Sequence, residues 1–156
     1  MLNTSKVLIW ELCIAGLLAL SACSTGPGWT TAALSVTDFK DEVYPVLIRD
    51  CAFQACHGAE GRFFRVWGPG RTRLTPLLSN AFSEATGDEI NRSYERAVSM
   101  VDHADPAQSL LLRKALATEA GGSGHLGADK FGRNVYRTVD DAGYLTLSRW
   151  VYSGSK

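Results

Sequence analysis

The sequence predicts a mostly α-helical domain with long loops, and three observations lead to that fold class. Apolar residues recur at helical spacing in several segments, whereas no stretch alternates apolar and polar residues as a strand does. Glycine and proline cluster between those segments and interrupt regular structure. The chain of 156 residues has room for one compact domain and a targeting segment. Long loops in so small a domain commonly surround a ligand.

The first residues are typical of an export signal. Lys6 precedes the apolar run "LCIAGLLALSA", which is short for a membrane-spanning helix and ends in small residues. The residues Leu20-Ser21-Ala22-Cys23 resemble the bacterial lipobox, in which the cysteine receives diacylglycerol and becomes the first residue of the mature protein. We therefore expect a lipoprotein signal peptide at 1–22, lipidation of Cys23 and a flexible tether at 23–36. The alternative is an uncleaved anchor helix.

The folded domain is expected to span residues 37–156 and to begin with a helix. Thr37 can cap that helix, and acidic residues follow in the first turn, where the helix dipole favours negative charge. The apolar residues that share one face are Phe39, Val43, Val46 and Leu47. Pro45 lies inside the segment and predicts a kink, because proline has no N–H to donate.

Three further helices are predicted at about residues 88–101, 105–114 and 140–154. The first has Ile90, Tyr94, Ala97 and Val101 at helical spacing. The second opens on an Asp-Pro pair, a favourable N-cap followed by a favourable first helical residue. The third ends at a glycine, as helices often do. The stretch "GRFFRVWGPGRTRL" before them and the glycines at 121, 122 and 124 predict loops.

The stretch from Cys51 to Gly58, "CAFQACHG", carries the chemistry. Two cysteines with a histidine directly after the second are typical of covalent haem attachment, usually written CxxCH. The two thiols add to the vinyl groups of the porphyrin, and the adjacent histidine then reaches the iron. Here the cysteines are two residues further apart than usual. Two alternatives stay open: a disulfide between Cys51 and Cys56 with His57 at the surface, or a zinc site that needs further ligands.

Three stretches together resemble a known family. They are "FKDEVYPVLIRDCAFQACHG", "DPAQSLLLRKAL" and "GYLTLSRWVYSG". The chain from about residue 39 to 154 resembles the single-haem cytochrome c-like domains of planctomycete-type surface proteins and related bacterial lipoproteins. The arginine-rich loop and the helix over 80–100 look like an insertion relative to the shortest members. The resemblance implies a small cytochrome c-like helical domain around one haem c, with Cys51 and Cys56 as the covalent attachment sites and His57 as the proximal iron ligand.

The second axial ligand is expected from the stretch "GGSGHLG". His125 lies there at the place where the resembling domains carry their distal ligand, and the glycines around it allow the backbone to approach a flat macrocycle. Met100 and His103 are the alternatives in the mature chain, and an open iron site is a further one. Two imidazoles imply a lower reduction potential than a histidine with a methionine.

The arginine-rich loop offers partners for the two haem propionates. A guanidinium fork suits a carboxylate, so Arg71 and Arg73 are expected to contact the propionates, with the indole N–H of Trp67 as a further donor. The alternative is a solvated basic loop.

These features predict an electron carrier. The net charge is zero, so composition gives no indication of nucleic-acid binding. No catalytic acid–base pair or nucleophile accompanies the haem motif, so we expect an electron carrier with redox partner proteins and a lipid anchor in a bacterial membrane. Ser24 after the lipidated cysteine implies the outer membrane, with the domain facing the periplasm or the surface. The alternatives are a haem-free, disulfide-stapled adaptor and a haem enzyme or gas sensor with an open iron site.

Overall fold

The computed structural model describes residues 33–76, 80–125 and 135–154. Across these ranges the protein is mostly helical and contains no strand, which confirms the predicted helical class. An isolated parallel bridge joins Leu116 to Tyr136. The same ranges include no helix with the length and hydropathy that a membrane crossing requires. The expected signal peptide at 1–22, the lipid on Cys23 and most of the tether lie outside the described residues.

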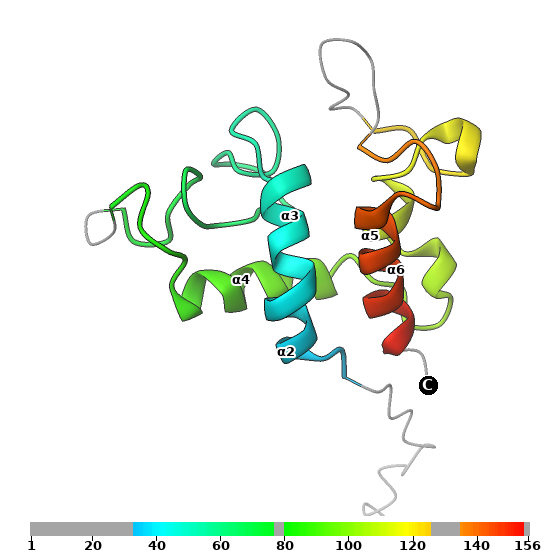
Figure 1. The fold of residues 1–156 in the computed structure, drawn as a ribbon, viewed down its shortest axis with the longest axis horizontal. Coiled ribbons are helices and arrows are strands. Elements are labelled where there is room, and N and C mark those ends of the chain that lie inside the picture. Colours follow the sequence, from blue (N-terminus) through cyan, green and yellow to red (C-terminus); the bar gives the residue numbers. More distant parts are fainter. Residues whose placement is uncertain (1–32, 77–79, 126–134, 155–156) are drawn as a thin grey trace, which may run out of the picture. The chain divides into compact units, whose positions relative to one another are not determined.

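Three short elements follow one another without a break and form one long helix (Figure 1). They are α2 (Val36–Asp38), the π-helical turn η2 (Phe39–Val43) and α3 (Tyr44–Asp50). The irregularity that Pro45 predicts takes the form of this π turn. The N–H of Tyr44 reaches back five residues to the carbonyl of Phe39, just before the position where proline cannot donate.

The long helix begins two residues earlier than the sequence predicts. Ser35, in extended conformation, accepts a hydrogen bond from the N–H of Asp38 on its Oγ at 3.1 Å. Thr37, the expected cap, lies inside α2 and is exposed. Serine and threonine are both good caps, so the choice depends on where the preceding chain enters.

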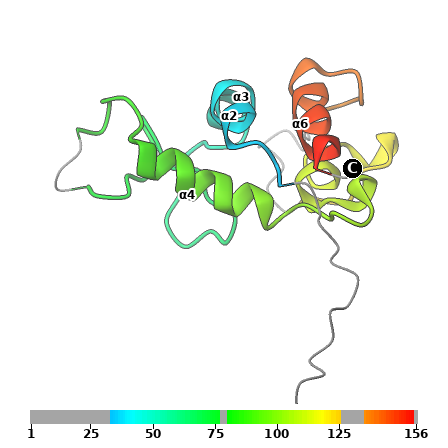
Figure 2. The same cartoon turned by 90° about the horizontal axis from the view of Figure 1, so that it is seen from below.

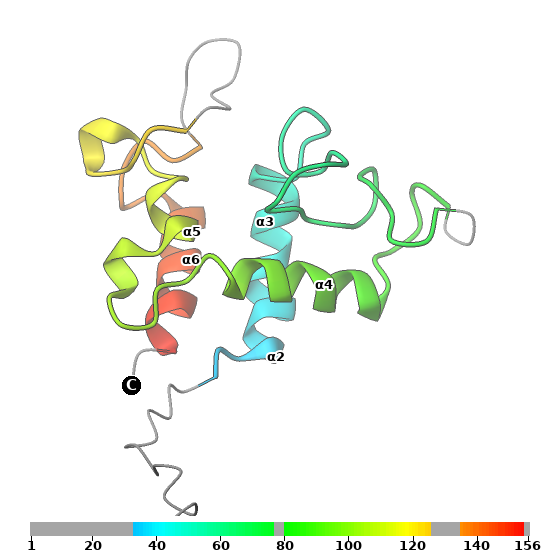
Figure 3. The same ribbon diagram turned by 180° about the vertical axis from the view of Figure 1, so that it is seen from behind.

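Two other helices pack against this long helix. Helix α6 (Ala142–Ser153) lies alongside it and contacts both η2 and α3, whereas α4 (Gly87–Val98) crosses it (Figures 1 and 3). Figure 2, which looks almost along α2 and α3, shows α4 nearly side-on as it passes next to them. Thr86 caps α4 with a complete capping box that includes Glu89.

An aromatic cluster fills the space where the three helices meet. Phe39 is fully buried, and its ring centroid lies 5.4 Å from that of Tyr94 on α4 and 5.3 Å from that of Trp150 on α6. The polar ends of the two partners also fix the start of the long helix. The hydroxyl of Tyr94 donates to the carbonyl of Leu34 at 2.7 Å, and Nε1 of Trp150 donates to the carbonyl of Ser35 at 3.0 Å.

The helix expected over 105–114 is divided in two by Ser109. A 3₁₀ turn, η3 (Pro106–Gln108), precedes α5 (Leu110–Arg113), because Ser109 has an extended ψ of 125°. The side chain of Ser109 is buried and accepts a hydrogen bond from the N–H of Asp102 at 3.0 Å. A second 3₁₀ turn, η4 (Thr118–Ala120), follows α5 and leads into the glycine-rich loop.

A buried ion pair organises the long loop between α3 and α4. Arg73 and Glu89 form two hydrogen bonds of 2.7 and 2.8 Å, and their side chains are only 3% and 0% exposed. Arg73 also donates to the backbone carbonyls of Asn80, Ser83 and Glu84. The loop is therefore gathered around one guanidinium group, which satisfies carbonyls that no regular element pairs.

Candidate functional site

A cavity of about 360 Å³ lies between the end of α3, helix α5 and the glycine-rich loop. Its volume falls within the range of ordinary small-molecule sites. The lining includes both cysteines of the motif, two histidines, one methionine and several apolar side chains. The residues that line it are Asp50, Cys51, Ala55, Cys56, His57, Arg62, Phe63, Phe64, Met100, Leu110, Leu111, Lys114, Ala115, His125, Val135 and Leu147.

The cysteine motif forms a compact loop at the end of α3. The N–H of Cys51 still donates to the carbonyl of Leu47 at 3.0 Å and closes the helix. Beyond it, the N–H of His57 donates to the carbonyl of Cys51 at 3.1 Å, so the two ends of the motif meet. The N–H groups of Cys56 and Gly58 both donate to the carbonyl of Phe53. The two additional residues of the motif are thereby taken up in hydrogen-bonded turns.

Both cysteines of the motif are free thiols that line the cavity. Cys51 is buried and Cys56 is half-buried. Burial raises the pKa of Cys51 to about 12, with Asp50 and Cys56 adding to the effect, so Cys51 is a neutral thiol at ordinary pH. A disulfide between them, the feature on which the adaptor alternative depends, is not present in the described structure.

His57 is oriented by a backbone carbonyl. Its Nδ1 lies 2.8 Å from the carbonyl oxygen of Phe64. Because a carbonyl can only accept, Nδ1 carries the proton and donates it, which leaves the lone pair on Nε2 free. Burial lowers the pKa of His57, although the bond to Phe64 acts in the opposite direction, and the ring is therefore neutral at neutral pH. A neutral imidazole with Nδ1–H bonded to a carbonyl is the form in which histidine binds metals.

His125 faces His57 across the cavity. The two ring centroids are 5.7 Å apart and the ring planes meet at 49°. Burial lowers the pKa of His125, and Lys114 and Arg62 lower it further. The structure thus brings together the two histidines that the sequence analysis paired.

The two alternative ligands differ in position. Met100 lines the same cavity as His57 and His125. It follows α4, where its N–H donates to Ala97 and its carbonyl accepts from Leu111. His103 does not line the cavity, and its Nδ1 is buried without a hydrogen-bond partner. Of the two alternatives, only Met100 therefore lies at this cavity in the described structure.

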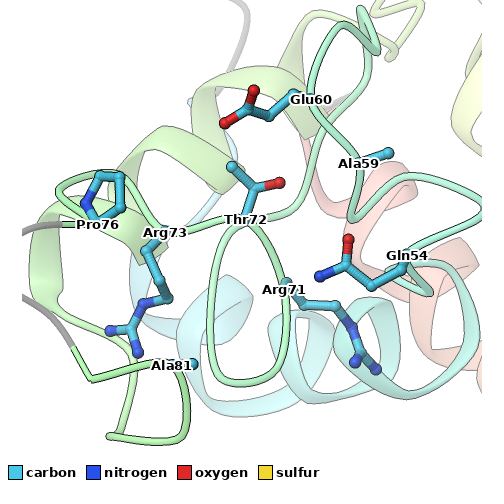
Figure 4. Close-up of a pocket in the computed structure, with 8 residues that line it drawn as sticks. All are labelled: Gln54, Ala59, Glu60, Arg71, Thr72, Arg73, Pro76 and Ala81. Atoms are coloured by element: carbon cyan, nitrogen blue, oxygen red, sulfur yellow. The ribbon is translucent and has the colours of Figure 1, made fainter.

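The three expected propionate partners lie away from this cavity. Arg73 is engaged with Glu89, as described above. Arg71 donates to the carbonyls of Gly70 and Ile48 and, with Arg73, lines a second, more open cavity of about 440 Å³ (Figure 4). Trp67 is buried, its backbone N–H donates to Ser93 Oγ, and the guanidinium of Arg65 covers its ring at 5.3 Å.

Two other basic residues, Arg62 and Lys114, line this cavity. Arg62 comes soon after the motif and donates to the carbonyl of Ala55 at 3.3 Å. Lys114 stands at the end of α5. Arg62 is part of the arginine-rich loop and could have been chosen from its closeness to His57. Lys114 is 57 residues further along the chain than His57, and only the packing of α5 brings it to the cavity.

Two hydrogen-bonded connections join the halves of the site. The hydroxyl of Tyr136 donates to Oδ2 of Asp50 at 2.9 Å, next to Cys51. The backbone of Tyr136 exchanges hydrogen bonds with Ala115 and Ala117, at 3.0 and 2.9 Å. The end of α3 is therefore linked to the segment that leads from α5 to His125.

Comparison with known protein families, curated proteins and solved structures gives no match to this chain. In the described ranges, no group of three or more His, Cys, Asp or Glu side chains is arranged to hold a metal ion. The groups at the cavity that can bind a metal ion are two thiols, two imidazoles, a thioether and the carboxylate of Asp50, beside two cationic side chains and several apolar ones.

Proposed function

We propose that this chain binds one haem c and transfers electrons, as a small cytochrome c-like domain. The observation that carries the proposal is the arrangement of the motif at the cavity. Cys51 and Cys56 line it as free thiols, and the carbonyl of Phe64 fixes the proton of His57 on Nδ1. Both features are what covalent attachment of a porphyrin and ligation of its iron require.

The residues that line the cavity have defined roles in this proposal. Cys51 and Cys56 form the thioether bonds, His57 is the proximal ligand and His125 is the distal ligand. Arg62 and Lys114 supply the positive charge that favours two propionates near the cavity. When bound, the haem supplies an iron that takes up and releases one electron. The apolar lining from Phe64, Leu111 and Leu147 excludes water from the centre, which helps to set its potential.

The first experiment tests covalent attachment. The chain is expressed together with a c-type maturation system, and a denaturing gel is stained for haem peroxidase activity. We expect a stained band for the wild type and none for the double variant Cys51→Ala/Cys56→Ala. The matched controls are the two single variants, each of which keeps one sulfur for a thioether bond. A colourless wild type with the mass of a disulfide-bonded chain would refute the proposal and support the adaptor.

The second experiment identifies the distal ligand. Absorption and electron paramagnetic resonance spectra of the purified protein report whether the iron is low-spin, as expected for two strong axial ligands. His125→Ala should produce high-spin iron, whereas Met100→Leu and His103→Ala should leave the spectrum unchanged. A wild type that is already high-spin and binds carbon monoxide at once would contradict the second ligand and favour an enzyme or a gas sensor.

The proposal includes a lipid anchor on Cys23 in the bacterial outer membrane, with the domain facing the periplasm or the cell surface, because residues 20–23 resemble a lipobox and Ser24 follows the cysteine. Labelling with a radioactive fatty acid tests it directly. Wild-type protein should carry the label and sediment with membranes, whereas Cys23→Ala should do neither. A label that persists in Cys23→Ala would show that another residue is modified.

A further inference from the structure

The loop that carries His125 is held by three hydrogen bonds against the end of α5 and the residues that follow it. The N–H of Gly122 donates to the carbonyl of Ala117 at 2.9 Å, and the N–H of Ser123 donates to the carbonyl of Arg113 at 2.8 Å. The third bond comes from a side chain: Nζ of Lys114 donates to the carbonyl of Gly124 at 2.8 Å. The three bonds fall on successive residues, so the loop is fixed one residue at a time up to His125.

Gly122 fixes the start of this loop by close approach. A Cβ at that position would lie 1.9 Å from the carbonyl oxygen of Leu116, a distance at which atoms overlap. Gly124 is different, since a Cβ there would meet nothing within 4 Å. The backbone at Gly124 therefore has open space around it, and its position depends on hydrogen bonding rather than on packing.

The bond from Lys114 to the Gly124 carbonyl is the last of these three hydrogen bonds before His125. Fixing the carbonyl of Gly124 orients the peptide plane that joins Gly124 to His125, and hence the direction in which the imidazole leaves the backbone. Lys114 itself is well placed to do so, because its own N–H donates to the carbonyl of Leu110 in α5. Its side chain also lines the cavity that His57 and His125 share.

We propose that Lys114 is a positioning residue that sets the imidazole of His125 opposite His57 through its hydrogen bond to the Gly124 carbonyl. This inference rests on the proposed function. Lys114 is exposed, so its bond to Gly124 competes with water and has the modest strength of an ordinary hydrogen bond. It shifts the balance between a bound and a released distal histidine, and does not determine whether the domain folds.

The test compares four forms of the haem-loaded protein: wild type, Lys114→Met, Lys114→Arg and Arg113→Gln. Lys114→Met removes the donor and keeps the length of the side chain. It should raise the fraction of high-spin iron and the rate of cyanide binding by about two- to tenfold, the equilibrium factor that one hydrogen bond is worth. Lys114→Arg keeps a charged donor and should restore most of the wild-type behaviour.

Arg113→Gln is the matched control for charge. It removes one positive charge from the residue next to Lys114, and the guanidinium of Arg113 neither lines the cavity nor contacts the loop, since it donates to Oε1 of Gln108 at 2.6 Å. If positioning matters, Arg113→Gln should leave the spin state unchanged. Equal effects of Arg113→Gln and Lys114→Met would overturn the inference, because they would assign the effect to charge alone.

A second readout does not depend on iron. Amide hydrogen exchange at Ser123 should be faster in Lys114→Met than in wild type or Arg113→Gln, measured on each protein as purified. Unchanged exchange, or haem-stained Lys114→Met with a wild-type spectrum, would overturn the role of Lys114 while the haem stain still supports the proposed function. An unstained wild type would refute the proposed function, and faster exchange would still support the tie between Lys114 and the loop.

Discussion

Single contacts determine how several residues of this protein behave, and the Arg73–Glu89 pair is the strongest case. Burial alone would raise the pKa of Glu89, but hydrogen bonds from Arg73 and from the N–H groups of Thr86 and Leu74 outweigh it and lower the pKa to about 2. The carboxylate is therefore charged in the interior at neutral pH. A buried charge of this kind is stable only while its partners are present.

Arg73→Met should therefore lower the free energy of unfolding by about 3–5 kcal/mol, because it leaves the Glu89 carboxylate buried without its counter-ion. Urea unfolding followed by circular dichroism measures the loss. The matched control is Arg92→Met, which breaks an ion pair with Glu95 whose side chains are 57% and 59% exposed. That change should cost less than about 0.5 kcal/mol, and equal losses in the two variants would contradict the role assigned to burial.

The same carboxylate predicts a pH dependence. Its folded pKa of about 2 lies below the ordinary value of 4.5, so its contribution to stability is complete above about pH 4.5 and is lost as the pH falls toward 2. The difference in unfolding free energy between wild type and Glu89→Gln should narrow over that interval. Unfolding curves at a series of acidic pH values test this, and a constant difference would show that Glu89 does not titrate as described.

Gly122 lies so close to the carbonyl of Leu116 that no side chain fits there, and this contact gives a third test of stability. Gly122→Ala should destabilise the domain by about 1–3 kcal/mol, the usual range for an overlap that the backbone must relieve. Gly124→Ala, two residues further along, places its methyl group where nothing lies within 4 Å and should change stability by less than about 1 kcal/mol. Thermal unfolding of both variants checks the contrast, and similar midpoints would argue against the close approach to Leu116.

At the scale of elements, caps decide where helices start. Ser35→Ala should lower the free energy of unfolding by about 1 kcal/mol, because the N–H of Asp38 loses its acceptor. Thr37→Ala should have almost no effect, since Thr37 is exposed inside α2. Chemical denaturation of the two variants distinguishes the cap seen in the structure from the one that the sequence favoured. A larger loss for Thr37→Ala would reverse that assignment.

The helices were largely predictable because their signals are local. The Asp-Pro start at 105, the end of the last helix at Gly154 and the long α4 follow from capping chemistry and periodicity. Pro45 predicted an irregularity in this helix, but it did not predict that the irregularity would be a π turn at Phe39–Val43. The break at Ser109 was not predictable, because it depends on a hydrogen bond with Asp102 that only the tertiary fold supplies.

The site was predictable where one motif carries it and not where distant segments meet. Cys51, Cys56 and His57 follow from one short stretch, and the glycines around His125 indicated a close approach of backbone. The expected use of Arg71 and Arg73 came from charge alone, which does not say where a guanidinium points. Their side chains serve the backbone of Ile48 and the carboxylate of Glu89 instead, while α5 brings Lys114 to the cavity.

For the molecule as a whole, the proposed cofactor should contribute to stability, because it would fill a cavity of about 360 Å³ that lies against core residues such as Leu111 and Leu147. Protein produced with a maturation system should unfold about 10 °C or more above the same sequence produced without it and kept reduced. Differential scanning calorimetry measures the two midpoints. Equal midpoints would mean that the cavity is not where the haem binds.

The continuous helix from Val36 to Asp50 separates two ends of this protein. Residues before Leu34 join the domain at its first turn, where Tyr94 and Trp150 fasten the backbone, and Cys51 follows its last turn. At 1.5 Å per residue the two ends are roughly 20 Å apart. The helix therefore keeps the point at which the described chain enters the domain away from the cysteine motif that follows its other end.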